Sequence, residues 1–306
     1  MIAAIGREMR RRQGSRAIGM ALALTAVLTV TPCQAWAQRE RYAPLVLQLP
    51  VSARTLAMGG LTAATQDVDA VFGNPALVGG NNTMSLSGGR YPGGASTGHL
   101  ATAMNVGSLG IGVGVAMLDA PSLTSTFPLR SPVLLDGGDL PASSLAATVA
   151  ASFAWKGMRW GAAAKYAEER ASLVRGGSVA ADVGVSKDIR NGSITTGLML
   201  QNLGRALSGD GSGRDLPARI ALGVGRSGYG LGKWFDLGGA ANLAVRRDGR
   251  VLPSAGGELT YVPIEGVSFS LRAGGRTPEL RAQQPLTAGL GLMLDRVSLD
   301  YGWEDL

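Results

Sequence analysis

Cysteine is nearly absent from this 306-residue sequence, in which Cys33 is the single example. It lies in an N-terminal segment that we expect to be removed, so disulfides and thiolate metal sites are excluded from the mature chain. Histidine is equally scarce, and His99 alone cannot form a zinc site. Aromatic residues make up 5% of the chain, and no basic run has aromatics interleaved with it. The composition therefore gives no case for binding nucleic acid.

The N-terminus resembles a secretory signal. Five arginines precede an apolar run over residues 17–30, and Ala35-Trp36-Ala37 supplies a small-x-small cleavage motif. The run is too short to cross a bilayer. We predict a signal peptide over residues 1–37, cut after Ala37. Removing its five arginines and one glutamate leaves 24 basic and 21 acidic residues, a net charge of about +3 rather than +7.

Glycine is in excess, with 46 residues, about twice its average share. From residue 83 onward, segments of about 8 to 11 residues are separated by Gly, Asp, Asn, Ser or Pro. Over residues 109–118 large apolar side chains alternate with Gly and Ala, and this period of two predicts a strand with one apolar face. We expect strands over 83–90, 98–106, 109–118, 143–155, 158–168, 178–187, 192–203, 218–226, 235–246, 254–262, 267–275, 286–294 and 297–303.

Two architectures have alternating strands, a membrane barrel and a soluble sandwich. The segments are longer than the usual five or six residues and match the ~9 to 11 that cross a bilayer obliquely. Short connections such as Lys156-Gly157 alternate with long ones such as 119–141, as periplasmic turns and outer loops do. Trp155 and Trp160 flank a tight turn, as in an interfacial girdle. We predict an all-β, transmembrane antiparallel barrel over residues 81–306. A soluble periplasmic β-sandwich is the alternative.

Residues 38–80 predict a small helical and turn plug rather than a strand. Gly59-Gly60 allow a sharp turn, and Thr65 and Asp67 can cap a short helix that begins near Val68. Asn74-Pro75 should end that helix, because the residue before a proline is pushed out of the α region. Helix capping and charge at a helix N-terminus also account for Asp69.

No motif indicates an enzyme. Residues 223–228 match G-x-G-x-x-G, but turn residues follow where a dinucleotide site needs a helix. No serine stands in a nucleophile elbow. Glu168, Glu169 and Arg170 lie at a strand end, where we expect them to be solvated. We predict no catalytic residue, no metal site and no cofactor.

Four short motifs in the plug carry a family resemblance: Ala53-Arg54, Ala57-Met58-Gly59-Gly60, Asp67-Val68-Asp69-Ala70 and Asn74-Pro75-Ala76. Together with Asp182-Val-Gly184 and Gln201-Asn202-Leu203-Gly204, they resemble the PorV/PorQ family of outer-membrane proteins, which are related in fold to the FadL fatty-acid transporters. The resemblance spans about residues 45–301. It implies a barrel of about 14 strands with an N-terminal hatch in its lumen. About 13 segments are found here, which conflicts with the even number expected of bacterial barrels.

The PorV resemblance implies a non-enzymatic outer-membrane component of protein export or surface attachment, similar to type IX secretion. Its partners would be membrane lipid and either secretion components or exported proteins. The alternative is a FadL-like channel for hydrophobic small molecules. We expect structural or gating positions at Arg54, Met58, Gly59, Gly60, Asp67, Asp69, Asn74 and Pro75. An apolar loop is the expected partner site, through Leu123, Phe127, Leu129, Leu134 and Leu135.

Overall fold

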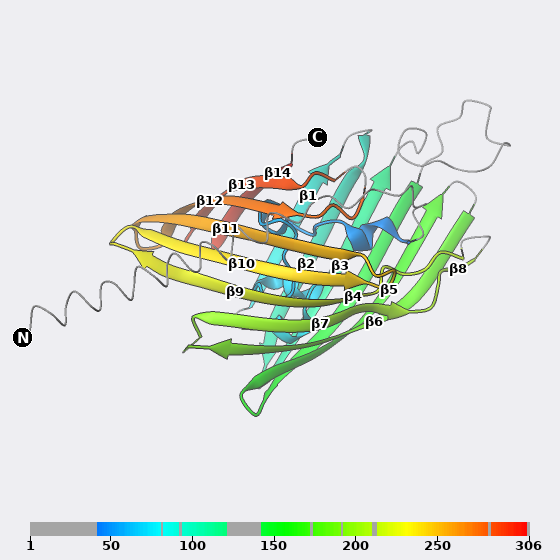
Figure 1. Ribbon diagram of the computed structural model, residues 1–306, viewed down its shortest axis with the longest axis horizontal. Coiled ribbons are helices and arrows are strands. Elements are labelled where there is room, and N and C mark those ends of the chain that lie inside the picture. The colour runs from blue at the N-terminus through cyan, green and yellow to red at the C-terminus, as the bar shows by residue number, and fades with distance from the viewer. Residues whose placement is uncertain are drawn as a thin grey trace, which may run out of the picture. The chain divides into compact units, whose positions relative to one another are not determined.

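The computed structural model describes residues 42–80, 82–91, 94–120, 142–171, 174–190, 192–209, 213–280 and 283–304. Short helices come first and strands follow (Figure 1). The helices are η1 (Leu45–Gln48), α2 (Ala53–Ala57), η2 (Val68–Val71) and η3 (Pro75–Leu77). The strands are β1 (Thr83–Arg90), β2 (Ser96–Val106), β3 (Leu109–Ala120), β4 (Ala142–Trp155), β5 (Met158–Ala171), β6 (Val174–Ile189), β7 (Ile194–Gly204), β8 (Ser208–Gly209), β9 (Arg219–Leu231), β10 (Phe235–Arg246), β11 (Val251–Ile264), β12 (Val267–Arg276), β13 (Leu286–Leu294) and β14 (Val297–Glu304). No helix in these ranges has the length and apolarity that a membrane span needs.

The strands form one antiparallel sheet of fourteen, which confirms the predicted fold class. Thirteen strands follow one another in chain order from β1 to β14, and the two-residue β8 pairs with β6. Every segment that the alternation predicted is a strand, although β6 begins four residues before 178 and β9 runs five residues past 226. The two outermost strands, β1 and β14, are not hydrogen-bonded to each other over the described residues.

Large apolar side chains face outward along the whole sheet. In β3 the exposed residues alternate with buried Gly and Ala, and Leu86 in β1 is 80% exposed while Val179 in β6 is 68% exposed. A sandwich would bury these side chains between two sheets. The small and polar face is instead the buried one. This inverted arrangement belongs to a barrel wall and excludes the sandwich for the described residues.

The two ends of the sheet differ. Tight turns such as Lys156-Gly157 gather at one end, which we name the short-turn end; both residues have positive φ, 51° and 75°, as the twisted two-residue hairpin requires. Aromatic rings gather there too: Trp155 and Trp160 lie 6.3 Å apart. The opposite end carries the long connections 121–141, 205–218 and 277–285, and we name it the loop end. The aromatic grouping agrees with the predicted girdle at one boundary.

Candidate functional site: the lumen plug

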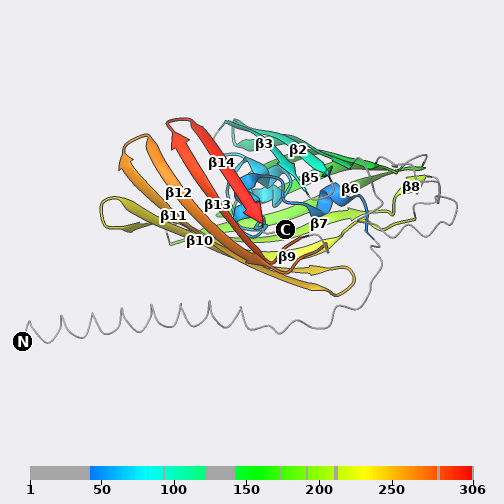
Figure 2. The same cartoon turned by 90° about the horizontal axis from the view of Figure 1, so that it is seen from above.

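Residues 42–80 lie inside the curved sheet, with strands on several sides of them (Figure 2). Helix α2 contacts β12, β13 and β14, whereas η3 contacts β4, β5 and β6. Helices η1 and η2 contact β3 and β4. The segment therefore fills the lumen and touches most of the wall, as the predicted plug should. We refer to residues 42–80 as the plug.

Helix α2 and the glycine turn follow local rules. Ser52 caps the helix, because its Oγ accepts a hydrogen bond from the backbone N–H of Thr55 at 3.1 Å. Gly59 and Gly60 then take φ values of 78° and 77°, which confirms the predicted sharp turn. A side chain at Gly59 would also approach the carbonyl oxygen of Gly275 at 2.8 Å. Glycine is needed here for conformation and for space.

The second predicted helix is present but is capped differently. Helix η2 begins at Val68 as expected, yet the Asp67 side chain makes no capping hydrogen bond. The Thr65 hydroxyl bonds to the carbonyl of Leu61 at 3.1 Å instead. The predicted cap at Thr65 is therefore wrong, because its hydroxyl bonds within the loop. Asp67 occupies the predicted N-cap position, and its carboxylate lies near the charged groups described below.

Asn74 does more than end this helix. Its side-chain oxygen accepts from the N–H of Ala76 at 3.1 Å, so it caps η3, and its amide nitrogen donates to the Ala63 carbonyl at 2.8 Å. Pro75 occupies the first position of η3, where its missing N–H costs nothing. Asn74 is fully buried. The residue joins two stretches of the plug to each other.

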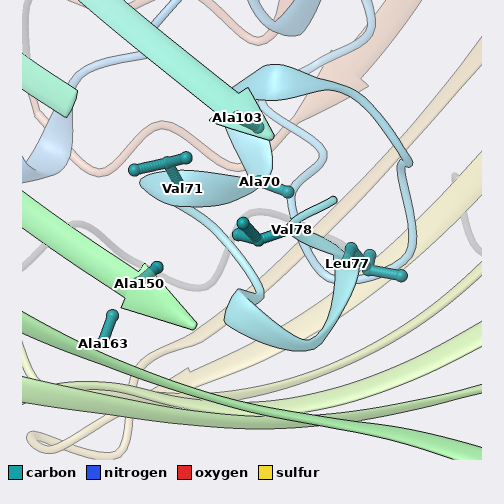
Figure 3. Packing of buried hydrophobic residues seen from close by; sticks show 7 residues of the cluster. All are labelled: Ala70, Val71, Leu77, Val78, Ala103, Ala150 and Ala163. Carbon is teal, nitrogen blue, oxygen red and sulfur yellow. The ribbon is translucent and has the colours of Figure 1, made fainter. Parts of the chain in front are cut away.

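An apolar cluster seals the plug against β2, β4 and β5 (Figure 3). Val71 and Leu77 are at most 1% exposed, and the wall offers only alanine to them. Small wall residues let the backbones come close, which increases the contact area between plug and wall. The members of this cluster are Ala70, Val71, Leu77, Val78, Ala103, Ala150 and Ala163.

Glycines of the wall bring the plug closer still. A Cβ built on Gly161 would overlap the backbone of Pro75 and Ala76, and one on Gly256 would lie 2.5 Å from the Met58 carbonyl oxygen. Nine strands contribute such positions, and we name the set the glycine wall. It consists of Gly110, Gly112, Gly114, Gly161, Gly184, Gly197, Gly223, Gly225, Gly256, Gly274, Gly289 and Gly302. The glycine excess of the sequence is therefore largely an adaptation to the plug.

A series of ion pairs connects α2 to the wall. Arg54 lies 3.4 Å from Glu258 of β11. Glu258 also pairs with Arg272 of β12, and Arg272 pairs with Asp300 of β14. The Arg272 side chain is 7% exposed, so each charge needs its partners. The predicted position Arg54 is thus a contact between plug and wall.

Asp67 and Asp69 lie near Arg54 within the plug. Asp69 accepts a hydrogen bond from the Thr55 hydroxyl at 3.2 Å. Burial and the nearby Asp69 carboxylate together raise the pKa of Asp67 to about 7, against the lowering effect of Arg54. Burial also raises the pKa of Asp69. Keeping both carboxylates ionised in the lumen is therefore costly near neutral pH.

A buried ion pair stands beneath the turn that follows η2. Lys165 of β5 and Asp182 of β6 are 2.5 Å apart, and their side chains are 3% and 0% exposed. Lys165 also donates to Asn202 at 3.2 Å, and the backbone N–H of Asn202 donates to Asp182 at 2.7 Å. Buried charges of this kind are stable only when paired and hydrogen-bonded.

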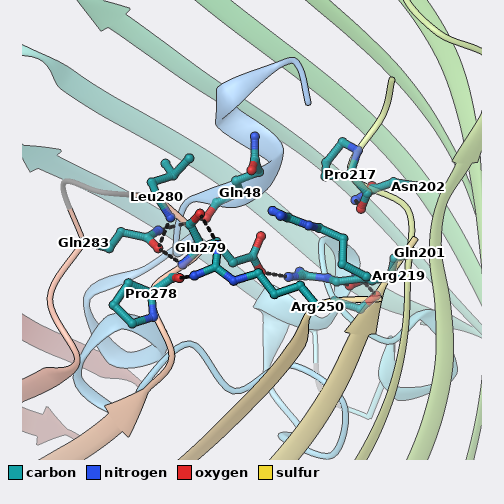
Figure 4. Close-up of polar contacts among 12 residues, drawn as sticks. Gln48, Gln201, Asn202, Pro217, Arg219, Arg250, Pro278, Glu279, Leu280 and Gln283 are labelled. Carbon is teal, nitrogen blue, oxygen red and sulfur yellow. Dashed lines mark hydrogen bonds and ion pairs between the residues drawn. The ribbon is translucent and has the colours of Figure 1, made fainter. Parts of the chain in front are cut away.

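The loop end of the plug is held by polar side chains (Figure 4). Gln201 of β7 donates to the carbonyls of Phe72 and Gly73 at 2.9 and 3.0 Å and accepts from Arg219 at 2.8 Å. Arg219 also pairs with Glu279 at 2.5 Å. Gln283 donates to the carbonyl oxygen of Gln48 at 3.0 Å.

A cavity of about 80 Å³ lies beside this network, between η1 and the wall. Its lining combines apolar side chains with charged and amide groups. The apolar lining includes Val46, Leu49, Val51, Ala116, Ala146 and Leu252, and the polar lining includes Lys165, Gln201, Arg219 and Glu279. An amphipathic chamber therefore lies directly below the loop end.

Sequence reasoning missed the wall residues of this site. Lys165 interrupts a run of alanines at an inward position of β5, which is the one signal that marks it. Asp182, Gln201 and Asn202 belong to motifs of the family resemblance but received no role. Glu258 and Arg272 pair with each other across the β11–β12 hairpin, but their other partners, Arg54 and Asp300, come from more distant parts of the sequence.

Three further sequence expectations have clear outcomes. Glu168 and Glu169 are buried rather than solvated, because arginines cover both carboxylates; Arg170 is exposed as predicted. Residues 223–228 lie within β9, so they form no phosphate-binding turn. His99 is buried in β2 beside Phe72, at 6.3 Å between ring centroids. The predicted partner-loop residues Leu123 to Leu135 lie outside the described residues.

No family model matches the sequence, and no curated protein matches it. Solved structures do. The toluene transporter TodX of Pseudomonas putida matches with a TM-score of 0.53 at 11% identity, over 81% of this chain and 90% of TodX. A deltaS2 mutant of the TodX monoaromatic hydrocarbon channel gives a TM-score of 0.52 at 10% identity, over 81% and 90%. The toluene transporter TbuX of Ralstonia pickettii gives 0.49 at 14% identity, over 79% and 88%.

At these identities the likeness is one of fold. It supports the FadL-like part of the resemblance and gives no support to the narrower PorV/PorQ assignment or to type IX secretion, which stay predictions. The chain has the fold of the TodX barrel, with a plug packed in its lumen.

Proposed function

We propose that the protein lies in the outer membrane and passes small hydrophobic molecules across it, with the plug as its gate. The observation that carries this proposal is the chamber between η1 and the wall, at the loop end of an otherwise filled lumen. The outward apolar face fits a bilayer environment. The fold shared with TodX, a toluene transporter, adds support.

The size of the chamber implies movement of the plug. Its volume of about 80 Å³ is smaller than the ~150 Å³ of an engineered apolar cavity that holds benzene. A monoaromatic molecule would therefore have to displace part of η1. Below the chamber, the glycine wall leaves no space, so onward passage also requires the plug to shift.

An engineered disulfide tests the gate. The Cβ of Ala64 lies 3.2 Å from a Cβ built on Gly223, close to the ~3.5 to 4.5 Å of a disulfide. Without Cys33, which lies in the predicted leader, Ala64→Cys/Gly223→Cys would hold the only two cysteines. We expect uptake of labelled toluene into cells to stop when this pair is oxidised and to return on reduction.

Each single cysteine variant is the matched control: its uptake sets the baseline for any displacement by the added side chain, and that uptake should be the same under oxidising and reducing conditions. Swelling of proteoliposomes in sucrose should stay slow in every case, because no water-filled channel is proposed. Equal toluene uptake by the oxidised and reduced double variant would contradict a gating plug. Uptake no greater than in cells without the protein would contradict the transport function.

A second candidate is the export or surface-attachment role implied by the PorV resemblance. The depth of contact between plug and glycine wall favours it, because a scaffold needs no open lumen. In that case the oxidised double variant would remain fully active in export, and deletion of residues 122–135 would abolish capture of secretion components from solubilised membranes. Intact capture after this deletion would remove the support for the apolar loop.

A further inference from the structure

Strands β5 and β6 run side by side to the loop end (Figure 1). A cluster of polar side chains lies on the outer face of the wall there. Along β5, Lys165 and Glu169 contact the plug. Because strand side chains alternate, Tyr166, Glu168 and Arg170 point away from the lumen. Arg175 of β6 lies directly opposite Arg170. These four residues form what we name the outer-wall arginine cluster: Tyr166, Glu168, Arg170 and Arg175.

Glu168 organises this cluster. Its Oε1 accepts from Nε of Arg170 at 2.7 Å, and its Oε2 accepts from Nη2 of Arg175 at 2.6 Å and from the Tyr166 hydroxyl at 2.8 Å. The carboxylate is 8% exposed, whereas the two arginine side chains are 56% and 61% exposed. Tyr166 lies across Gly177, where an added Cβ would come within 3.2 Å of its hydroxyl. The guanidinium groups are thus held in place while remaining accessible.

The charges in the cluster do not balance. Like charges directly opposite each other on neighbouring strands are destabilising, and Arg170 and Arg175 form such a pair. Glu168 neutralises only one of the two. Arg170 bonds to Glu168, and Arg175 bonds to Glu168 and interacts with the Tyr166 hydroxyl. A guanidinium has five N–H donors, so each arginine keeps further donors for a ligand. The cluster is therefore built to receive an anion.

The position of the cluster along the wall indicates which anion it binds. Toward the short-turn end, the same face continues with Val179 and Val183, which are 68% and 47% exposed. The cluster thus marks the loop-end boundary of the apolar band. Long loops face outward in such barrels, and a tyrosine at the edge of the band is typical of the headgroup level. Guanidinium groups bind phosphate oxygens in a bidentate manner.

We propose that the outer-wall arginine cluster binds the phosphate group of a lipid in the outer leaflet, with Arg170 and Arg175 as its ligands. The acyl chains of that lipid lie along the apolar column of β6. This inference rests on the proposed outer-membrane location. It is independent of whether the barrel transports anything.

Native mass spectrometry of the detergent-purified mature protein tests the proposal with two probes, dipalmitoyl phosphatidic acid and dipalmitoyl phosphatidylcholine. We expect phosphatidic acid to bind about tenfold more tightly. Arg170→Gln/Arg175→Gln should lose this preference, and Arg170→Lys/Arg175→Lys should lose most of it, because lysine keeps the charge without the bidentate fork. Arg247→Gln/Arg296→Gln is the matched control, since it removes two exposed charges elsewhere, and it should bind like the wild type.

Heat-modifiable mobility on gels identifies any variant that fails to fold, and the lysine variant then carries the comparison. Equal binding of the two lipids, or an unchanged preference in the glutamine variant, would overturn the proposal. Displacement of the lipid by millimolar inorganic phosphate would also overturn it, because that result assigns the cluster to a free anion. Toluene uptake is a separate measurement, so a failed transport function leaves this test intact.

Discussion

The plug contacts the wall in two different ways. From Ala53 to Val78 its backbone and buried side chains lie directly against the glycine wall, which contributes no side chains of its own at these contacts. From Tyr42 to Val51 it is held by long polar side chains such as Gln283, and it borders the chamber. We name these stretches the packed part and the tethered part. The difference indicates which part moves more readily. The packed part can shift only by breaking its contacts with the glycine wall, whereas the tethered part can exchange hydrogen bonds with water or a ligand.

The largest expected effect concerns the buried ion pair of the wall, between Lys165 and Asp182. Asp182→Asn would leave the buried Lys165 ammonium without its carboxylate, and removing one partner of a buried pair costs about 3–5 kcal/mol. Thermal unfolding in detergent, followed by heat-modifiable mobility, measures the loss. Asp188→Asn is the matched control, because the pair of Asp188 with Arg159 is partly exposed and should contribute under about 1 kcal/mol. Equal losses in both variants would contradict the role given to burial.

Gly161→Val tests the packed part. The new side chain would collide with the backbone at Pro75 and Ala76, which cannot rotate away, and overpacking of this kind costs about 1–3 kcal/mol. We expect the plug to be displaced, so that single-channel conductance in planar bilayers rises above that of the wild type. Gly98→Val is the control, and its channel should stay closed, since a Cβ at Gly98 meets no atom within 4 Å. A closed Gly161→Val channel would show that the packed part adapts.

Asp67 provides a pH test of the packed part. Its pKa is about 7 in the folded protein, whereas the ordinary value of an aspartate is 3.8. The folded state therefore binds the proton more tightly than the unfolded chain. Stability is therefore highest below about pH 4 and falls as the pH rises through 7. At about 1.4 kcal/mol per pKa unit, the largest loss of unfolding free energy that this shift can cause is roughly 4 kcal/mol. Solvent screening in the lumen reduces this loss, and we expect about 1–2 kcal/mol.

Asp67→Asn should remove this fall. Unfolding midpoints measured at pH 5.5 and pH 8.5 should then coincide for the variant, while those of the wild type differ. A variant that keeps the full difference would assign the pH dependence to another group, with Asp69 the first to test.

Gln283→Ala tests the tethered part and should have the smallest effect. The variant loses the hydrogen bond to the Gln48 carbonyl and two hydrogen bonds that the side-chain oxygen accepts from Glu279 and Leu280. A hydrogen bond contributes about 1 kcal/mol net, so amide exchange in η1 should speed up by about tenfold. The channel should stay closed, with the same conductance as the wild type. An open channel in this variant would mean that the tethered part also seals the lumen.

The strands were predictable because alternation depends on nearest neighbours. Over Leu109–Ala120, a period of two is sufficient to identify β3 and to separate its large face from its small face. The Gly59 turn and the helix starting at Val68 were equally local. The capping role of Thr65 was wrong, because its hydroxyl bonds to the carbonyl of Leu61 instead. Burial of Glu168 and Glu169 was missed because their partners lie outside β5: Arg175 comes from β6 and Arg214 from the connection between β8 and β9.

By itself, the sequence determined an all-β chain whose long strands have one apolar and one small face, preceded by a turn-rich segment. Those properties follow from side-chain period and backbone preference, which act over a few residues. Only the tertiary structure decided which face points outward, what the wall glycines accommodate, and which charges meet across the lumen. Each of these depends on contacts between residues far apart in the sequence, such as Gly161 with Pro75 in the plug and Arg54 with Glu258. No local pattern records such contacts.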